Sequence, residues 1–246
     1  VWRLSRDARG CREVQEALHA AAGDAERAAL ALELQGHVWE ALQCPHANHV
    51  VQKCIASIPP QRSQFILDEL LRRDVARAAQ HKYGCRIVQR LLEHLAPEQV
   101  EGLREALLED DVRGMSVHPY GNYAVQSLLE HGSPAHQRRA LQGLCGDVAE
   151  LGASPCGAAV LAAGLAHGPP EGRLPLARAL VGAPGLLERM AGTRHGHLAV
   201  QRAAQALRGT PLEARVHARL SADLGALAAG RYGRALAASL GLLPHA

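Results

Sequence analysis

The apolar residues of this sequence recur at steps of three and four, which is the spacing of an amphipathic helix. Residues 122–130 show one such apolar stripe, formed by Ala124, Val125, Leu128 and Leu129. No segment alternates between apolar and polar residues for long enough to indicate a strand. The pattern therefore predicts an all-α protein made of short amphipathic helices.

The helical pattern returns at a nearly constant interval. Three similar segments have glutamines 37 residues apart, at Gln52, Gln89 and Gln126. Steps of 36 to 39 residues locate four further copies, which contain Gly10, Gly157, Gly196 and Gly233. A unit of two or three helices cannot bury its apolar face alone, so neighbouring units must stack. We therefore expect an α-solenoid of about seven copies of 36–39 residues.

Prolines and aspartates mark the rest of each copy. Prolines follow five of the glutamine positions, at Pro60, Pro97, Pro134, Pro170 and Pro211. Aspartates recur further along and resemble caps of a short helix, at Asp74, Asp111 and Asp147. Each copy is thus predicted to hold a short helix, a turn with glycine, the glutamine helix and a third helix begun by proline, such as residues 61–72. In this third helix Ser133 and Thr210 are the expected N-caps.

The composition indicates which residue types form the core and which cellular environment suits the protein. Hydrophobic residues make up 48% of the chain and aromatic residues only 3%, so the core must consist of Leu, Ala and Val. No apolar run approaches the roughly 20 residues that span a bilayer. The net charge of +3 fits a polyanionic partner. The six cysteines contain no C-x-x-C pair, which favours reduced thiols in a cytosolic or nuclear protein.

The glutamine helices carry a second recurring position. The residue after each turn glycine, or after Ala47 in its place, and the glutamine four residues later are neighbours on one side of a helix, expected to lie off the apolar stripe. These candidate base-edge contacts are Cys11 with Gln15, Asn48 with Gln52, Cys85 with Gln89, Asn122 with Gln126, and His197 with Gln201. Amides offer a donor and an acceptor, as a base edge requires. Between them lie the flat groups Arg12, His49, Arg86 and Tyr123, which suit base stacking. A solvated polar helix face is the alternative interpretation.

At this point a family resemblance is evident. The segment Tyr120-Gly-Asn-Tyr-Ala-Val-Gln126 resembles copies in the Pumilio homology domain of the PUF family. The succession of residues at Cys11, Asn48, Cys85 and Asn122 resembles the third to sixth of that family's roughly eight repeats. The resemblance implies a right-handed α-solenoid in which residues 1–246 form a single, partial domain. On this register we expect the family's two N-terminal repeats to be missing, which is consistent with a start at Val1 without Met. Residues 150–246 are expected to be degenerate repeats and a C-terminal cap, the latter around Arg231–Arg234.

The resemblance also implies a function. The family binds mRNA 3′ untranslated regions sequence-specifically and causes repression or decay of the message. Its Cys/Gln pairs read adenine, its Asn/Gln pairs uracil and its Ser/Glu pairs guanine, on an RNA that runs antiparallel to the protein. Applied to the pairs of this chain, this code implies the core 5′-UAUA-3′, or UANA because the family tolerates other bases at the repeat that matches Asn48 and Gln52. The family further implies a cytoplasmic monomer that binds neither DNA nor membranes, with translational-repressor or deadenylase proteins on its convex face.

One copy departs from the family pattern. Where the family reads the guanine of UGUA with a Ser/Glu pair, this chain has Ala158 and Ala162, with Ala159 in the stacking position. The next copy has only aliphatic Leu198 as its stacker. We therefore expect weakened recognition of the upstream UG. The competing hypothesis is a protein-binding helical-repeat scaffold that has lost RNA specificity.

Catalytic and metal chemistry have little support in the sequence. No G-x-S-x-G, P-loop or H-E-x-x-H motif is present. Cys44, His46, His49 and Cys54 are close in sequence and could suggest zinc, but the repeat already accounts for His49. We expect no enzyme activity, no cofactor and no metal.

Overall fold

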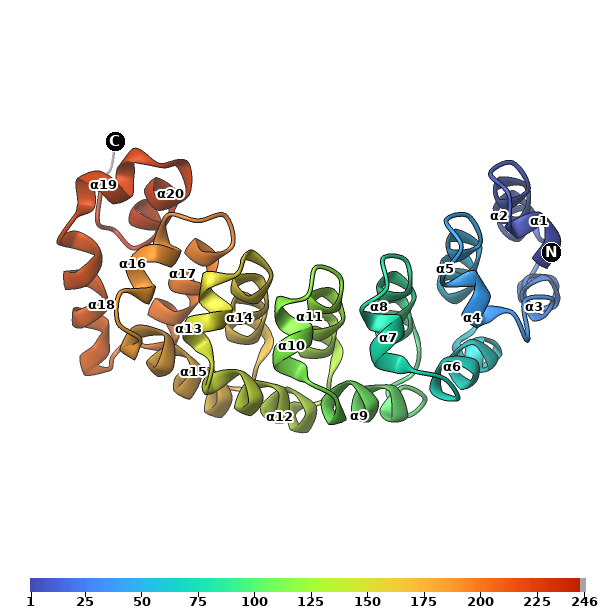
Figure 1. Cartoon of the computed structure of the whole chain (residues 1–246), viewed down its shortest axis with the longest axis horizontal. Helices are drawn as coiled ribbons and strands as arrows, with labels where there is room; N and C mark the ends of the chain where they lie inside the picture. The colour runs from blue at the N-terminus through green and yellow to red at the C-terminus, as the bar shows by residue number, and fades with distance from the viewer. Residues whose placement is uncertain (244–246) are drawn as a thin grey trace. The chain divides into compact units, whose positions relative to one another are not determined.

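The computed structural model describes residues 1–243, and these form helices joined by short turns, without a strand (Figure 1). The helices follow a recurring order of three that occurs seven times, the last time without its third member. The predicted all-α class and the seven copies are therefore confirmed. Each copy opens with a short helix: α1 (Trp2–Ser5), α4 (Val38–Ala41), α7 (Val75–Ala79), α10 (Val112–Val117), α13 (Val148–Ala153), α16 (Leu186–Ala191) and α19 (Leu224–Ala229).

The second helix of each copy carries the glutamine position or its equivalent. These middle helices are α2 (Gly10–Ala20), α5 (Ala47–Ser57), α8 (Gly84–His94), α11 (Gly121–His131), α14 (Pro155–His167), α17 (Gly196–Ala206) and α20 (Arg231–Ser239). In α11 the predicted apolar stripe is buried, and each of its four residues is at most 1% exposed. The spacing of apolar positions therefore identified the core side of the helix correctly.

From the second copy to the sixth, the third helix follows the repeated proline, whereas α3 of the first copy has none before it. These helices are α3 (Asp24–Leu32), α6 (Gln64–Leu71), α9 (Glu101–Glu109), α12 (Pro134–Cys145), α15 (Pro170–Gly182) and α18 (Pro211–Ser221). A 3₁₀ turn, η1 (Pro60–Ser63), leads directly into α6, so the helix expected at residues 61–72 is present in two parts. Proline occupies the first helical position in α12, α15 and α18, where its missing N–H costs no hydrogen bond.

The predicted caps are only partly confirmed. Asp74 and Asp111 accept a hydrogen bond from the backbone N–H three residues later, at 2.8 and 2.9 Å. Ser133 caps α12 in the same way, at 3.4 Å. For Asp147 the prediction is wrong, because its carboxylate pairs with Arg113 at 3.2 Å instead of capping α13. It is also wrong for Thr210, whose hydroxyl donates backwards to the Leu207 carbonyl at 2.6 Å.

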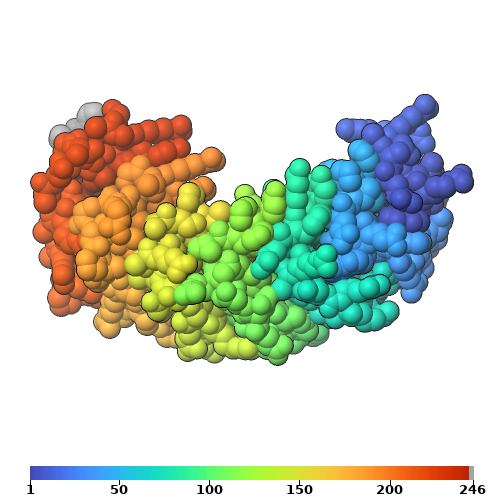
Figure 2. Space-filling view, viewed as in Figure 1, coloured from blue at the N-terminus to red at the C-terminus, as the bar shows by residue number. Residues whose placement is uncertain are grey.

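The chain divides into two compact units, Val1–Asp110 and Asp111–Ala246. The first holds three copies and the second holds four. That residues 1–246 act as one domain stays a prediction. Within each unit successive middle helices are in contact: α5 lies between α2 and α8, and α14 lies between α11 and α17. Figure 2 shows neighbouring copies of each unit packed closely side by side. No helix in residues 1–243 is long and apolar enough to cross a membrane.

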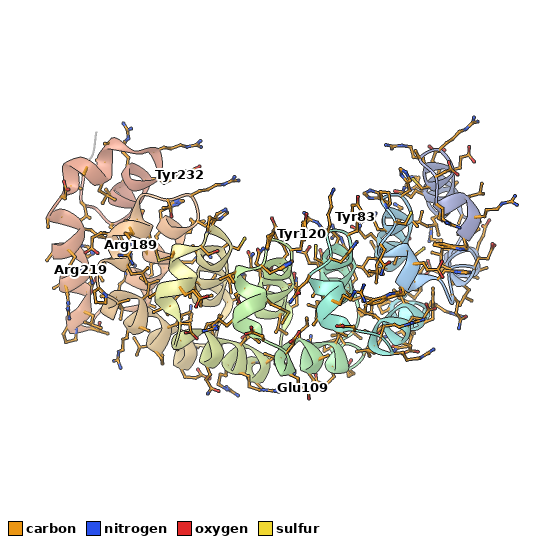
Figure 3. The ribbon with its side chains drawn as sticks, in the orientation of Figure 1. Tyr83, Glu109, Tyr120, Arg189, Arg219 and Tyr232 are labelled. Atoms are coloured by element: carbon orange, nitrogen blue, oxygen red, sulfur yellow. The ribbon has the colours of Figure 1, made fainter. Side chains whose placement is uncertain are left out.

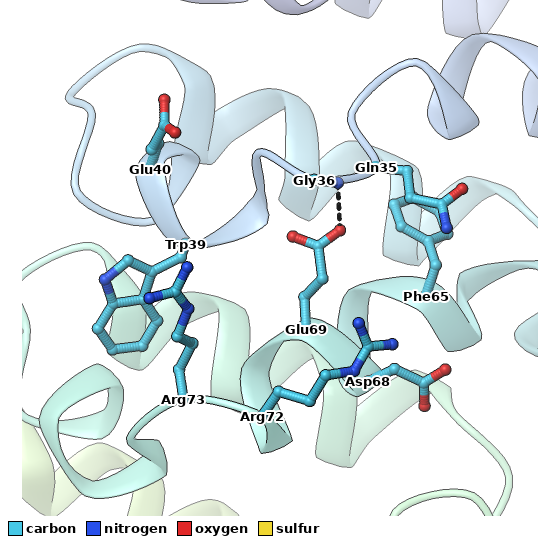
Figure 4. A pocket seen from close by; sticks show the side chains of 9 residues that line it. All are labelled: Gln35, Gly36, Trp39, Glu40, Phe65, Asp68, Glu69, Arg72 and Arg73. Atoms are coloured by element: carbon cyan, nitrogen blue, oxygen red, sulfur yellow. Dashed lines mark hydrogen bonds between the residues drawn. The ribbon is translucent and has the colours of Figure 1, made fainter.

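In the first unit, a glutamate of the second copy holds the turn that leads into that copy. The Glu69 carboxylate on α6 accepts hydrogen bonds from the backbone N–H groups of Gly36 and Val38, the latter at 3.0 Å (Figure 4). Gly36 has a φ of 86°, a left-handed conformation that favours glycine. These contacts border a cavity of 470 Å³ whose lining includes Trp39 and Arg72. None of the candidate base contacts lines this cavity.

In the second unit, an arginine ties two helices of the sixth copy together. Arg219 on α18 makes two parallel hydrogen bonds to Glu188 on α16, both at 2.7 Å. These bonds hold the pKa of the Glu188 carboxyl below its ordinary value.

Figure 3 shows Arg219 and Arg189 apart from Tyr120 and Tyr232, which lie along the edge formed by the loops before the middle helices.

The turn glycine lets the short and middle helices of a copy approach closely. A Cβ at Gly84 would lie 2.4 Å from the Ala78 carbonyl oxygen, and one at Gly157 would lie 2.3 Å from that of Leu151. Only a residue without a side chain fits such an approach without displacing the backbone. In the copies that carry it, the glycine thus brings the middle helix close to the short helix and sets the position of the candidate residue that follows.

Candidate nucleic-acid interface

The candidate base-edge residues lie in the first two turns of the middle helices. The Asn/Gln pairs share the same internal hydrogen bond: Gln52 donates to Asn48 Oδ1 and Gln126 donates to Asn122 Oδ1, each at 2.9 Å. The asparagines also donate backwards, Asn48 to the Cys44 carbonyl at 2.7 Å and Asn122 to the carbonyls of residues 118 and 119 at 2.8 and 3.0 Å. Each pair is therefore held in one arrangement before any ligand is bound.

The asparagines are buried, which differs from the expectation that both members lie off the apolar stripe. Asn48 is 1% exposed and Asn122 is 3% exposed. The physical reason is that side chains at a helix start lean towards the preceding turn. There the asparagine amide satisfies carbonyl groups that the helix leaves unpaired. The glutamine is the member of each pair that reaches solvent, because Gln52 and Gln126 are both half-buried.

The Cys/Gln pairs follow the same division. Cys11 and Cys85 are 5% and 1% exposed, and each thiol points to a carbonyl three residues earlier at 3.5 Å. Burial raises the pKa of Cys85, so its thiol stays protonated at neutral pH. Gln15 donates to the Cys11 carbonyl at 3.0 Å and stays half-buried. Gln89 is also half-buried and accepts a hydrogen bond from the Arg86 side chain at 3.5 Å.

The four candidate stacking residues are all exposed. They occupy the same position of their helices, directly after the buried residue: Arg12, His49, Arg86 and Tyr123. Together with the glutamines they form what we call the glutamine surface. In the first unit it consists of Arg12, Gln15, His49, Gln52, Arg86 and Gln89, and in the second unit of Tyr123, Gln126, Leu198 and Gln201. Each copy from the first to the fourth therefore presents one flat side chain and one amide.

The fifth and sixth copies present fewer polar and flat side chains at the candidate positions. Ala158 and Ala162 are 2% and 4% exposed, so this copy offers no polar group at the candidate positions. Gln201 and Leu198 are half-buried. The ring of His197 stacks on Tyr232 with 5.1 Å between ring centroids, and its Nδ1 lies 3.0 Å from the Thr193 carbonyl. Only its Nε2 is left for a base edge.

A further repeated position supports the start of each middle helix, and the sequence analysis did not single it out. The residue three positions before the turn glycine accepts a hydrogen bond, through its side chain, from the backbone N–H of that glycine. In the second copy the donor is the backbone N–H of Ala47, which replaces the glycine. The acceptors are Asp7, Cys44, His81, His118, Ser154 and Thr193. The same 36–39-residue interval links them, and their varied side-chain types obscure it in the sequence.

The structure does not bring the four candidate zinc ligands together. Within residues 1–243, Cys44, His46, His49 and Cys54 are not gathered into a group that could hold an ion. Cys54 is fully buried and burial raises its pKa to about 12, whereas His49 points to solvent. The described residues form no disulfide, and all six cysteines are free.

Sequence comparison identifies the repeat. The profile described as the Pumilio-family RNA binding repeat matches residues 43–71, 75–108 and 111–145, which are the second, third and fourth copies. Three copies of this chain match the Pumilio-family repeat. No curated protein sequence matches the chain significantly.

Solved structures show the same fold over nearly the whole chain. PUF-8 in complex with PBE-RNA has a TM-score of 0.79 and 23% identity, covering 98% of this chain and 70% of that one. Puf3 bound to a Cox17 RNA 3′ UTR recognition sequence has a TM-score of 0.80 and 22% identity, covering 97% and 73%. Yeast Puf5p bound to SMX2 RNA has a TM-score of 0.71 and 17% identity, covering 97% and 68%. The Pumilio-type α-solenoid fold therefore extends beyond the three copies that the profile matches.

Proposed function

We propose that this protein binds single-stranded RNA in a sequence-specific manner. The observation that carries the proposal is the glutamine surface of the first four copies, where each copy presents one amide and one flat side chain. Amides pair with base edges and flat groups stack on base faces, which together recognise an unpaired strand. The Pumilio-family repeats and the RNA bound to PUF-8, Puf3 and Puf5p support the same conclusion.

The preferred core is 5′-UA(U/N)A-3′. In the arrangement seen at Gln52 and Gln126, one Nε2–H donates to the asparagine, which leaves Oε1 and the second Nε2–H for a ligand. Uracil offers the matching acceptor and donor side by side. The cysteine copies lack the asparagine amide and leave space and an apolar contact, in keeping with the larger adenine. Recognition of the upstream UG is weakened, because the alanine copy has no polar group to offer.

The biological setting is part of the proposal. The Puf3 complex contains a 3′ UTR recognition sequence, which supports an mRNA 3′ untranslated region as the target. We infer a cytoplasmic, monomeric protein that represses the message or promotes its decay, with translational-repressor or deadenylase proteins on the surface opposite the RNA.

A compensatory change of specificity tests the proposal. In the family, Ser/Glu pairs read guanine where Cys/Gln pairs read adenine. The double variant Cys85→Ser, Gln89→Glu should therefore prefer an RNA with the core UGUA, and the unmodified protein should prefer UAUA. Binding is measured with short synthetic RNAs by filter retention. The matched control is Glu98→Gln, an exposed change that touches none of the candidate contacts.

The result separates the two functional hypotheses. A preference that moves from adenine to guanine supports direct reading by the third copy. Equal, weak binding of both RNAs by both proteins would contradict RNA recognition and favour the protein-binding scaffold.

A further inference from the structure

The surface of the alanine copy is hollowed where its neighbours carry reading side chains. The recess has a volume of 230 Å³ and lies within the second unit, over α14 and between α11 and α17. Its lining includes Ala159, Ala162 and Ala163 from α14, Gln126 from α11, and Leu198 and Arg202 from α17. The recess therefore interrupts the glutamine surface between Gln126 and Gln201.

The side chains explain why the recess exists. The three alanines reach only to Cβ, whereas the equivalent helices on either side carry glutamine, leucine and arginine. The longer side chains of the neighbours form walls around an apolar floor. The recess is thus a product of the same alanines that removed the reading groups from this copy.

Arg202 gives the recess a fixed polar rim. Its Nη1 donates to the Ala162 carbonyl at 2.6 Å, which holds the guanidinium against α14. Arginine has five N–H donors and no acceptor, so donors beyond this bond remain for a ligand. The recess therefore combines a floor of alanines, an aliphatic wall at Leu198 and a polar rim that contains Arg202 together with Glu130, His167 and His195.

We propose that this recess holds one nucleobase of the bound RNA without selecting its identity. The inference rests on the proposed RNA binding, because a strand that contacts Gln126 and Gln201 must pass over α14. A base has a flat apolar face for the alanines and Leu198, and a polar edge for Arg202. Every base offers at least one acceptor to a donor, so Arg202 does not discriminate between bases. The alanine copy acts as a spacer that retains affinity and gives up specificity.

An abasic nucleotide separates this proposal from a simple gap. The test compares UGUAUAUA RNA with RNAs whose second nucleotide is A, C, U or an abasic sugar. The four bases should bind within about threefold of one another, and the abasic RNA should bind at least about fivefold more weakly, since one base-face contact is worth that much. Equal binding of the abasic RNA would overturn the proposal, as would a preference of more than about tenfold for one base.

Filling the recess provides the matched variant. Ala159→Leu places a larger side chain on the floor and should abolish the difference between the abasic RNA and the others. Ala149→Leu, an exposed change on α13 away from the recess, should leave the difference intact. An abasic penalty that persists unchanged in Ala159→Leu contradicts the proposed location. Failure of every RNA to bind, the UAUA core included, would instead defeat the proposed RNA binding itself.

Discussion

At the scale of single residues, the two members of a base-edge pair differ in burial and in role. In the first four copies the first member is buried and tied to the preceding turn, and the second carries the accessible amide. Asn122 thus contributes to folding, and Gln126 is free to contribute to binding. The i, i+4 spacing in the sequence could not reveal this division, because it states which residues are neighbours but not which one the turn covers.

This division predicts different effects from two alanine substitutions. Asn122→Ala removes donors to two backbone carbonyls in a buried site and should lower the free energy of unfolding by about 1–3 kcal/mol. Gln126→Ala removes a half-exposed amide and should change it by less than about 0.5 kcal/mol. Urea unfolding followed by circular dichroism measures both. Equal destabilisation by the two variants would contradict the assignment.

The buried thiol of Cys54 leads to a prediction about reactivity and pH. Burial raises its pKa from 9.0 to about 12, so the folded protein holds the proton more tightly than the unfolded chain does. The resulting stability is present below pH 9 and is lost as the pH rises towards 12. At pH 8 a thiol reagent should modify the half-buried Cys44 and Cys156 while Cys54 remains intact. Mass spectrometry of the native protein checks this, and early labelling of Cys54 would count against its burial.

At the scale of elements, the middle helices depend on a cap that differs in chemistry from copy to copy. In the fourth copy His118 Nδ1 accepts the N–H groups of Tyr120 and Gly121, at 3.1 and 3.0 Å. In the first copy an aspartate, Asp7, does the same for Arg9 and Gly10. What the repeat requires at this position is an acceptor, not a particular residue.

A pair of substitutions at His118 tests this requirement. His118→Ala should lower the free energy of unfolding by about 0.5–2 kcal/mol, as loss of an N-cap does. His118→Asp should retain most of the stability, because it supplies the acceptor that the first copy uses. Thermal unfolding distinguishes the variants. An aspartate variant as unstable as the alanine variant would show that ring packing, and not the cap, matters here.

Sequence reasoning predicted the elements well and the caps less well. The apolar spacing and the repeat interval indicated the middle helices, and the prolines marked the third helices, because proline favours the first helical position. It misplaced the roles of Asp147 and Thr210, which found partners outside their own helix ends. The recess was also beyond the sequence, since it arises from side chains on three helices whose contact no local pattern records.

At the scale of the whole molecule, specificity should be concentrated in the first four copies. Replacing the guanine of UGUAUAUA by cytosine should weaken binding by less than about tenfold, because no polar group of the alanine copy reads it. Replacing the adenine opposite the third copy should cost more, about 1–3 kcal/mol or 5- to 150-fold. Filter binding with both altered RNAs measures the ratio. A guanine effect larger than the adenine effect would reverse the proposed order of copies.

The varied caps have a consequence for how such a protein can change over time. Carboxylate, thiol, imidazole and hydroxyl groups all serve at the same place, so mutation can drift between them without breaking a helix. The residues of the glutamine surface lie further along the same helices and do not include the capping side chain. Because each copy carries its own helix cap, copies can be exchanged, reordered or added as modules. The chain is therefore a suitable scaffold for engineering new sequence preferences.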